Sequence, residues 1–529
     1  MTTTTSEPHA YLVGAGIASL AAAVFLIRDG HFEGGNIHVL EELPVPGGSL
    51  DGRGDPERGY VTRGGRMLEE EAYLCLWNLL EGIPSLDDPG KSVKDEIWEF
   101  NAAHPTNARA RLIGANHTIL DASDLGFDAR DRIEMGALLA LPEQALGTRR
   151  IEDMFSPHFF GTNFWFLWRT TFAFQNWHSA VELKRYFLRF IQEFPRIHTL
   201  SGVRRTKLNQ YDSIVRPVQA WLADHGVVVE HGVKVTDLDF TEADGERRVE
   251  RIHLRRDGDA ASIPLGPHDY AFVTLGSMTA DATYGDDRHA PKLVLDKEDG
   301  GWQLWETIAT KASDFGRPNT FDGNVAETKW ESFTLTMRDP LLLKRIEEFS
   351  GNEAGSGALM TFTESGWLMS IVLPHQPHFD GQPADVSTLW GYGLFLDKPG
   401  NFVEKTLAEA TGADILEELV GHLGFTDILD DLRATTTVIP VMMPYITSEF
   451  ERRAGDDRPQ VVPEGAKNFA FLGQYTEIPE GVVFTVEYSV RSAMKGVYEL
   501  LGIDKDIPDF SHGALDIATV FAALKTALS

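Results

Sequence analysis

The first fifty residues alternate short apolar runs with glycine-rich turns. Residues 11–13 form an apolar run typical of a buried strand, and residues 20–29 are rich in Ala and Leu at helical spacing. Gly14-Ala15-Gly16-Ile17-Ala18-Ser19 lies between them. A second apolar run, 36–40, ends at Glu41. This order predicts a strand, a tight turn, a helix and a second strand.

The turn has the residues that a dinucleotide requires. Gly14 permits a tight turn, and Gly16 lets the backbone approach a pyrophosphate at the positive end of the helix. Ser19 takes the place of the usual third small residue, and Glu41 can accept hydrogen bonds from a ribose hydroxyl. A glycine turn alone would be an ordinary turn, but the strand, turn and acid together indicate a dinucleotide site.

A second glycine pair, Gly47-Gly48, follows the acid in the segment PVPGGSLDG. Glycines at this position are typical of flavoproteins rather than NAD enzymes, so the sequence predicts FAD. The residues expected to contact it here are Gly14, Gly16, Ala18, Ser19, Glu41, Glu42, Gly48 and Ser49.

Later segments return to the same predicted domain. Residues 226–240 read as two strands, residues 270–276 as a strand that ends in a turn, and residues 468–474 as another buried strand. Residues 486–501 have helical periodicity, although this last strand and helix could equally be ordinary core elements. These returns add further expected cofactor contacts, namely Val235, Gly276, Ser277, Phe484 and Thr485.

The pattern predicts an α/β fold with a flavin-binding, Rossmann-like three-layer domain, an interleaved mixed α+β substrate region and a helical C-terminal part. The flavin domain is expected at 8–75, about 205–290 and 465–502. The substrate region is expected at about 76–204 and 291–464, and a helical segment at 503–529. Within the substrate region, the aromatic-rich stretch before residue 191 is predicted to form either core or an apolar tunnel for an acyl chain.

Composition narrows the function classes. The 529-residue chain has 48 Lys plus Arg against 79 Asp plus Glu, a formal charge of -31 that disfavours nucleic acid as a partner. A single cysteine, Cys75, excludes an intramolecular disulfide, and the polar N-terminal residues do not resemble a signal peptide. No apolar run approaches the roughly 20 residues of a membrane span. We therefore expect a cytoplasmic protein with at most peripheral membrane contact.

Ordered motifs along nearly the whole chain resemble the oleate hydratases, also called myosin-cross-reactive antigens. The motifs are LEELPVPGGSLDG, TRGGRM, YLCLW, FQNWHSAVELKRYFLRF, NQYDS, QPHF, WGYGL, MPYIT and FLGQ with VFTVEYSVRSA. The resemblance implies an FAD-dependent hydro-lyase that adds water to the cis-9 double bond of free oleic acid, giving 10-hydroxystearic acid. Linoleate is a second expected substrate.

The resemblance also implies the catalytic groups. A tyrosine of the family protonates the alkene, and its motif falls on Tyr186. In the family a glutamate after Arg-Gly-Gly-Arg activates water, but here Met67 stands in that position. Three explanations stay open: Glu69 or Glu70 reaches the site, the flavin and backbone activate water alone, or the reaction has changed. By the same resemblance Arg63, Gly64, Gly65 and Arg66 contact the flavin.

The substrate contacts are less strongly marked. Val372 and Pro374 replace a polar Thr and Asn of many family members, so the site is expected to be less polar. The turn Ser277-Met278-Thr279 offers donors for a carboxylate, or is a simple strand-ending turn. Trp177 and His378 are further expected substrate contacts. No metal is predicted, because the histidines His178, His375 and His378 lack partners at ligand spacing.

Two other classes stay open: a redox flavoenzyme of the amine-oxidase or desaturase type, and a non-catalytic protein that binds FAD or fatty acid. Substrate that bleaches the flavin would indicate the first, and binding without product the second. Residues 514–528 have an apolar face at helical spacing, which predicts a docked helix or a membrane-surface contact. We expect a monomer rather than a homodimer, because few residues precede the first strand compared with many family members.

Overall fold

A five-stranded parallel sheet forms the centre of the first domain in the computed structural model, which describes residues 7–65 and 67–510. Its strand order is β19–β12–β1–β2–β8. The strands come from distant parts of the chain: β1 (Ala10–Val13), β2 (Ile37–Leu40), β8 (Val228–Glu230), β12 (Tyr270–Thr274) and β19 (Phe469–Leu472). The Rossmann-like fold predicted from the sequence is therefore confirmed, and its sheet is built from strands far apart in the chain.

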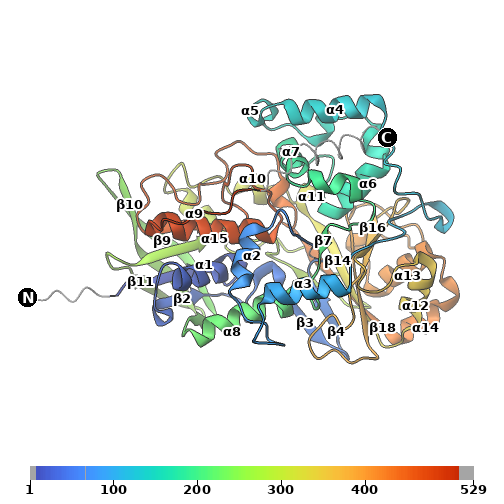
Figure 1. The fold of residues 1–529 in the computed structure, drawn as a ribbon, viewed down its shortest axis with the longest axis horizontal. Helices are drawn as coiled ribbons and strands as arrows, with labels where there is room; N and C mark the ends of the chain where they lie inside the picture. The colour runs from blue at the N-terminus through green and yellow to red at the C-terminus, as the bar shows by residue number, and fades with distance from the viewer. Residues whose placement is uncertain (1–6, 66, 511–529) are drawn as a thin grey trace, which may run out of the picture.

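Alternating side chains of these strands build three layers. Leu12, Val39 and Phe272 belong to one apolar cluster, with the helices α1 (Ile17–Arg28) and α15 (Val486–Leu501). Val13 and Val273 belong to the opposite cluster. Because side chains in a strand alternate between the two faces, each strand supplies both layers. The opposite layer contains β9 (Val233–Ala243), β10 (Glu246–Arg256), β11 (Asp259–Pro264) and α9 (Trp302–Ala309), at the left of Figure 1.

A second, seven-stranded sheet carries the substrate region. Its order is β13–β18–β14–β17–β16–β15–β6, antiparallel except where β15 meets β6. The strands are β13 (Thr283–Tyr284), β18 (Thr436–Met443), β14 (Trp330–Met337), β17 (Ser387–Gly393), β16 (Met369–Leu373), β15 (Ala358–Phe362) and β6 (Leu112–Ile113). The helices α12 (Leu341–Ser350), α13 (Gly412–Leu423) and α14 (Leu429–Thr435) lie beside this sheet (Figure 1).

A hairpin connects the two sheets. It is formed by β3 (Gly52–Asp55) and β4 (Gly59–Thr62). The amide of Tyr60 donates to Oγ1 of Thr336 at 2.8 Å, and the amide of Thr62 donates to Oγ1 of Thr334 at 3.2 Å. The hairpin therefore lies against β14, and the loop that follows it enters the space between the two domains.

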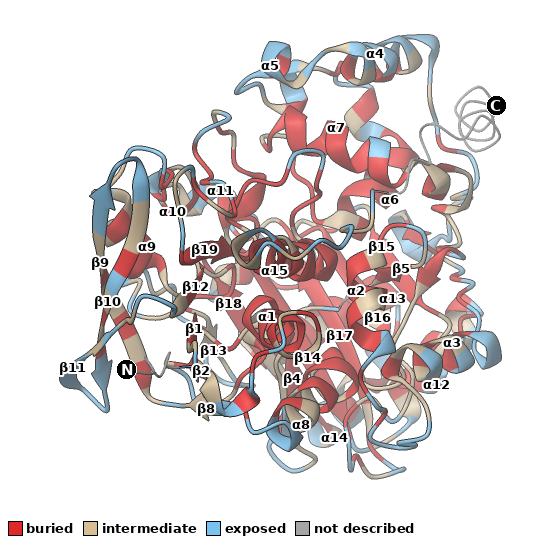
Figure 2. Ribbon diagram, turned by 60° about the vertical axis from the view of Figure 1, so that its left-hand side comes forward, coloured by how far each residue is buried: buried red, intermediate tan, exposed pale blue. Residues whose placement is uncertain are grey.

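The aromatic-rich stretch forms a helical layer around a core. Phe164 and Trp168 of α6 (Asn163–Phe172) and Phe187 of α7 (Ala180–Arg189) are buried, with ring centroids 4.9 to 5.9 Å apart. Edge-to-face packing of this kind adds to the burial energy of large rings. Figure 2 shows these helices buried while α4 (Ala129–Ala140) and α5 (Glu143–Leu146) above them are largely exposed. Core packing thus accounts for most of this stretch.

The remaining α-helices and β-strands lie outside the two main sheets. They are α2 (Leu74–Glu81), α3 (Val93–Ala103), α8 (Arg216–Asp224), α10 (Asn319–Asp322), α11 (Val325–Thr328), β5 (Leu68–Glu69) and β7 (Val203–Arg204). Among the described residues, no helix is long and apolar enough to cross a membrane.

The predicted domain boundaries divide two elements differently from the packing. Helix α9 was expected in the substrate region, but it packs on β9 of the first domain. Strand β13 was expected in the first domain, but it pairs with β18 of the large sheet. Residues 503–510 have no regular secondary structure, and the helix predicted at 514–528 lies outside the described residues.

Candidate active site

A groove at the carboxyl ends of β1 and β12 matches the predicted dinucleotide site. Gly14 has a φ of 85°, a conformation that favours glycine, and its amide donates to the carbonyl of Leu40 at 2.8 Å. Gly16 precedes α1, and a Cβ built on it would meet nothing within 4 Å. Of the predicted contacts, the groove is lined by Gly14, Gly16, Ala18, Glu41, Glu42, Gly48, Ser49, Arg63, Val235, Gly276 and Ser277.

Glu41 braces the glycine turn. Its Oε2 accepts from the amide of Ala15 at 2.5 Å and its Oε1 from the amide of Leu43 at 2.7 Å. Burial raises the pKa of Glu41. The neighbouring Glu42 lies 3.5 Å from Nζ of Lys234, and burial raises its pKa to about 7. Glu41 and Glu42 both line the groove, so either carboxyl group is placed to contact a ribose hydroxyl.

Arg63 ties together the segments around the groove. Its guanidinium donates to the carbonyl of Gly48 at 2.8 Å, to the carbonyl of Thr279 at 3.0 Å and to Oδ1 of Asp51 at 2.7 Å. Burial opposes the charge, but the adjacent Asp51 carboxylate outweighs it and the pKa of Arg63 is raised. A buried cation, an open glycine turn and the amino end of α1 fit the diphosphate of a dinucleotide such as FAD.

Gly64, Gly65 and Phe484 line a second cavity rather than this groove, and Ser19 and Thr485 line neither. The hydroxyl of Ser19 is buried 3.1 Å from Oγ1 of Thr274, which joins α1 to β12. Thr485 caps α15 by accepting from the amide of Tyr488 at 3.2 Å. Arg66 lies outside the described residues.

A second cavity adjoins the groove at Ser49, which lines both. It contains about 1140 Å³ of space free of protein atoms, part of which opens to solvent. Gly64, Gly65, Met67, Phe484 and His378 all line it, so the cavity brings together residues predicted for the flavin and for the substrate. Helix α6 borders it with Thr170 and Thr171 only, next to Ala173, so the predicted tunnel does not run through the aromatic core.

One part of the cavity wall is polar. We call Arg205, Gln210, His375 and His378 the polar set. Both amide atoms of Gln210 and the Nδ1 atoms of the two histidines are buried without a hydrogen-bond partner among the described residues. Burial lowers the pKa of His378 to about 4 and that of Arg205 to about 10, so at neutral pH the imidazole is neutral and the guanidinium charged. Within the described chain Arg205 donates only to carbonyls and a hydroxyl. The polar set therefore suits an anionic group of a ligand.

The two glutamates considered as substitutes for the family glutamate do not reach this cavity. Glu69 is buried and accepts from Arg196 at 3.2 Å, and burial raises its pKa. Glu70, directly after β5, pairs with Arg204 at 2.5 Å. Neither lines the cavity beside Met67.

Asp51 is the acidic side chain that does line it, alone among the described lining residues. Arg63 holds its Oδ1, while Oδ2 has no hydrogen-bond partner in the described part of the chain, and the side chain is 13% exposed. In the sequence, the PGGSLDG segment indicates the cofactor and the family, but no local signal marks Asp51 as a residue of the cavity. Asp51 and Arg63 are next to the last pair of the β3–β4 hairpin, Gly52 with Thr62. This pairing brings Asp51 beside Arg63 at the cavity.

Tyr186 lies just behind the cavity wall. Its hydroxyl donates to the carbonyl of Val483 at 2.6 Å, and its ring contacts Phe450 at a centroid distance of 5.7 Å. Phe450 in turn lies 5.3 Å from Phe484 of the wall. A second tyrosine, Tyr392, lines the cavity directly and donates to the carbonyl of Thr170. Burial raises the pKa of Tyr392.

Other predicted substrate residues lie elsewhere. Ser277, Met278 and Thr279 line the dinucleotide groove rather than the second cavity. The indole of Trp177 donates to the carbonyl of Glu327 at 2.9 Å and lines neither space. The turn is therefore placed to contact the cofactor.

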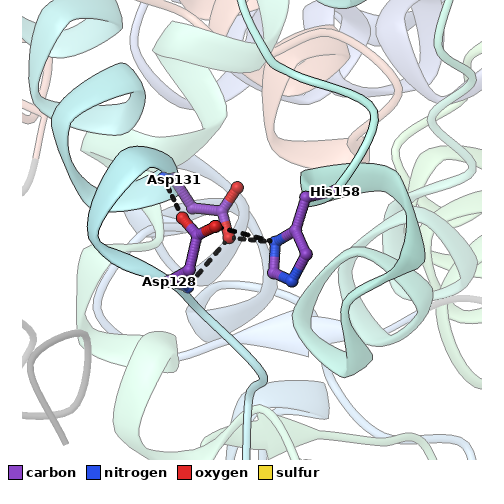
Figure 3. A group of neighbouring side chains, drawn as sticks. All are labelled: Asp128, Asp131 and His158. Atoms are coloured by element: carbon purple, nitrogen blue, oxygen red, sulfur yellow. Dashed lines mark hydrogen bonds and ion pairs between the residues drawn. The ribbon is translucent and has the colours of Figure 1, made fainter.

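Among the described residues, one group of side chains of the kinds that bind metals combines Asp128 and Asp131 at the start of α4 with His158 from a later segment (Figure 3). None of the three lines the groove or the second cavity. Asp128 caps the helix by accepting from the amide of Asp131, and His158 Nδ1 lies 2.8 Å from Oδ2 of Asp131. This pattern is a helix capping box completed by a histidine, and the hydrogen bonds account for it without an ion.

Comparison with known proteins agrees with the resemblance predicted from the motifs. The model of the MCRA family matches residues 7–498. The chain is 40% identical to an oleate hydratase of Streptococcus pyogenes, over 98% of this chain and 89% of that protein. It is 34% identical to a linoleate hydratase of Lactiplantibacillus plantarum, over 94% of this chain and 95% of that protein.

Solved structures share the fold at low sequence identity. A putrescine oxidase has a TM-score of 0.54 and 13% identity, over 94% of this chain and 99% of that chain. A cyclohexylamine oxidase from Brevibacterium oxydans has a TM-score of 0.51 and 13% identity, with the same coverage. These likenesses concern the fold alone. With a family model that matches nearly its whole length and two relatives above 30% identity, the chain belongs to the MCRA family.

Proposed function

We propose that the protein is an FAD-binding fatty acid hydratase that adds water to the cis-9 double bond of oleic acid. The observation that carries this proposal is the junction at Ser49, where a dinucleotide groove opens beside a cavity with one polar and one aromatic wall. Relatives that act as oleate and linoleate hydratases support the substrate class.

The carboxylate of the fatty acid binds the polar set. Arg205 supplies the positive charge, and Gln210 and His378 supply donors that otherwise lack partners. A buried polar group without a partner costs roughly 1–3 kcal/mol, and this cost is recovered when a carboxylate fills the site. The acyl chain then extends past Met67, Val372 and Leu359, which are apolar.

Hydration needs a proton donor for one alkene carbon and an acceptor for the proton that water loses. Tyr186 donates the proton, as the family resemblance implies, when its hydroxyl leaves the carbonyl of Val483. Water adds to the other alkene carbon, and Asp51 accepts its proton through the free Oδ2. The tyrosine then recovers a proton, so no electrons are transferred overall.

FAD, when bound, supplies a polarised ring system beside the double bond. The residues that would hold it are those of the groove, with Gly64 and Gly65 at the cavity. Arg63 fixes the groove to this loop through Gly48 and Asp51. We further propose that the protein is a cytoplasmic monomer and that its substrate is the free fatty acid. Sedimentation of the purified protein tests the oligomeric state.

The decisive experiment is incubation of the FAD-loaded protein with oleic acid in heavy-oxygen water, followed by mass spectrometry. The expected product is 10-hydroxystearic acid with one solvent oxygen. Unchanged oleate, with the flavin supplied oxidised or reduced, would reject the hydratase. A flavin bleached in proportion to the substrate consumed would instead indicate a redox flavoenzyme.

A further inference from the structure

Four aromatic side chains surround the cavity beside the loop that carries Met67. We call Trp330, Trp390, Tyr392 and Phe484 the aromatic box; all four line the cavity. The centroid of Tyr392 lies 5.0 Å from that of Trp330 and 5.0 Å from that of Trp390. Trp330 is 6.5 Å from Trp390 and 6.1 Å from Phe484, with interplanar angles of 61° and 79°. Tyr392 is tilted by only 32° to Trp330 and by 36° to Trp390, so it packs between them, and all four rings line the same cavity.

The register of two strands fixes this arrangement. Trp390 and Tyr392 alternate with Gly391 and Gly393 on β17, so both rings point to one face and both glycines to the other. A Cβ on Gly391 would meet the ring of Phe333 at 2.4 Å, and one on Gly393 would meet Leu407 at 2.3 Å. The opposite face is thus filled by neighbours, and the strand cannot turn its aromatic face away from the cavity.

The box lies directly against the loop of the proposed reaction. A Cβ on Gly65 would meet the ring of Trp390 at 2.9 Å, so this indole packs on the loop backbone. The indole nitrogens of Trp330 and Trp390 are buried and have no hydrogen-bond partner among the described residues.

We propose that the aromatic box stabilises the positive charge that develops on the alkene when it is protonated, an inference that rests on the proposed hydration. Protonation of one alkene carbon forms a C–H bond and leaves the other carbon electron-deficient. Aromatic faces attract a cation within about 6 Å of the ring centroid, and the attraction is strongest for Trp and for desolvated sites. The box supplies two Trp faces, one Tyr and one Phe.

This assignment explains why a methionine is tolerated at position 67. A carbon cation that is held by aromatic rings reacts with neutral water, whose oxygen lone pair forms the new C–O bond. The proton is lost only afterwards, to Asp51. A strong base at the moment of attack is then unnecessary, so Met67 removes no required step. A carboxylate at position 67 and the aromatic box are thus two ways to lower the same barrier.

The test measures binding of a cation that imitates the intermediate. The probe is 10-azaoctadecanoate, which is protonated at its amine nitrogen at neutral pH, and its uncharged counterpart is 10-oxaoctadecanoate. Calorimetric titration of the FAD-loaded protein should give at least tenfold tighter binding of the amine than of the ether. Trp390→Leu should reduce this ratio to near one while it leaves the ether affinity within about threefold.

Two further variants separate charge stabilisation from packing. Trp221→Leu removes a tryptophan that stacks on His225 outside the cavity, and should keep the full ratio. Trp390→Phe keeps a weaker aromatic face and should give an intermediate ratio. If Trp390→Leu does not fold, site-specific replacement of Trp390 by tryptophans with increasing fluorination should lower the ratio stepwise, which a packing role would not do.

The outcomes are distinct from those of the hydration assay. Equal affinity of the wild-type protein for amine and ether would overturn the aromatic box even if oleate is hydrated. A tenfold preference that survives Trp390→Leu would also overturn it. Preference for the amine without hydration of oleate would reject the proposed reaction and leave a cation-binding cavity.

Discussion

The hydroxyl of Tyr186 donates a 2.6 Å hydrogen bond to the carbonyl of Val483. This bond joins α7 of the substrate region to the segment that precedes α15 of the dinucleotide domain. The next residue, Phe484, has a φ of 66° and lines the cavity. A side chain in this backbone region is strained, and such strain is often kept where function requires a fixed position. The proposed donor is therefore anchored to a segment that lines the cavity and leads into α15.

Tyr186→Phe should lower the rate of hydration by about 10²–10⁴-fold, because it removes the proton donor and keeps the ring. The comparison is Tyr392→Phe, which removes the hydroxyl that donates to Thr170 but preserves the aromatic face, and should lower the rate by less than about tenfold. Initial rates of 10-hydroxystearic acid formation check both variants. The reverse order of the two losses would assign the donor to Tyr392.

Asp51→Asn should slow hydration by about ten- to a hundredfold, because the amide cannot accept the proton released by water. The Asn oxygen can still accept from Arg63, so FAD affinity, followed by quenching of flavin fluorescence, should change little. Asp55→Asn is the matched control, since Asp55 lies on the same hairpin and accepts only from turn amides of Glu57 and Arg58. Full activity of Asp51→Asn with bound FAD would show that the proton goes elsewhere.

Gln210→Leu should weaken binding of free oleate by about ten- to a hundredfold and leave binding of methyl oleate nearly unchanged, because a hydrogen bond to a charged group is worth roughly 1.5–3 kcal/mol. Equilibrium titration of the FAD-loaded protein measures both ligands. Gln192→Leu provides the control, since the amide of Gln192 is also buried without a described partner but lies outside the cavity wall. Equal losses for acid and ester would place the carboxylate away from Gln210.

His378 makes stability depend on pH in a defined direction. Burial lowers its pKa to about 4, against about 6.5 in the unfolded chain, so between these values the unfolded state binds more protons. Stability is therefore fully present above pH 6.5 and is lost as the pH falls toward 4, by at most about 3 kcal/mol from this group. His378→Gln should reduce that loss in urea unfolding measured at pH 7 and pH 4.5. Identical losses in wild type and variant would contradict the assignment.

Gly16→Ala should separate folding from cofactor binding. Gly16 has a φ of -70° and open space at its Cβ position, so alanine fits the cofactor-free chain without strain. The added methyl group lies where the pyrophosphate must approach, so FAD affinity should fall at least about tenfold while the melting temperature of the FAD-free protein is unchanged. Gly161→Ala, which also adds a methyl group to open space, should affect neither quantity.

The dinucleotide domain could be predicted from the amino-acid sequence, because its signals are local. The order of strand, glycine turn and helix within residues 10–28 is a property of neighbouring residues, and the helix predicted at 486–501 is observed with those bounds. The same local pattern predicted Gly14 and Gly16 as residues of the dinucleotide site, and both line the groove. Motif order along the whole chain indicated the family for the same reason, since it requires no knowledge of contacts.

The side chains that reach the second cavity could not be predicted in this way, because long-range packing places them. Glu69 and Glu70 are close to Met67 in sequence, but Arg196 and Arg204 hold their carboxylates and neither side chain lines the cavity. Asp51 lines the cavity instead. It comes directly before the first residue of the hairpin, and the pairing of Gly52 with Thr62 places it beside Arg63.

The aromatic box shows the same dependence on long-range register. Trp330 and Trp390 come from strands sixty residues apart, and the pairing of β14 with β17 places both rings on one face. The local sequence W-G-Y-G fixes that the two rings point to one face of β17 and the two glycines to the other. The ring face is the one that meets the cavity because Phe333 and Leu407 fill the glycine face. Side-chain direction in a sheet is thus settled by partners distant in the chain, which no local pattern specifies.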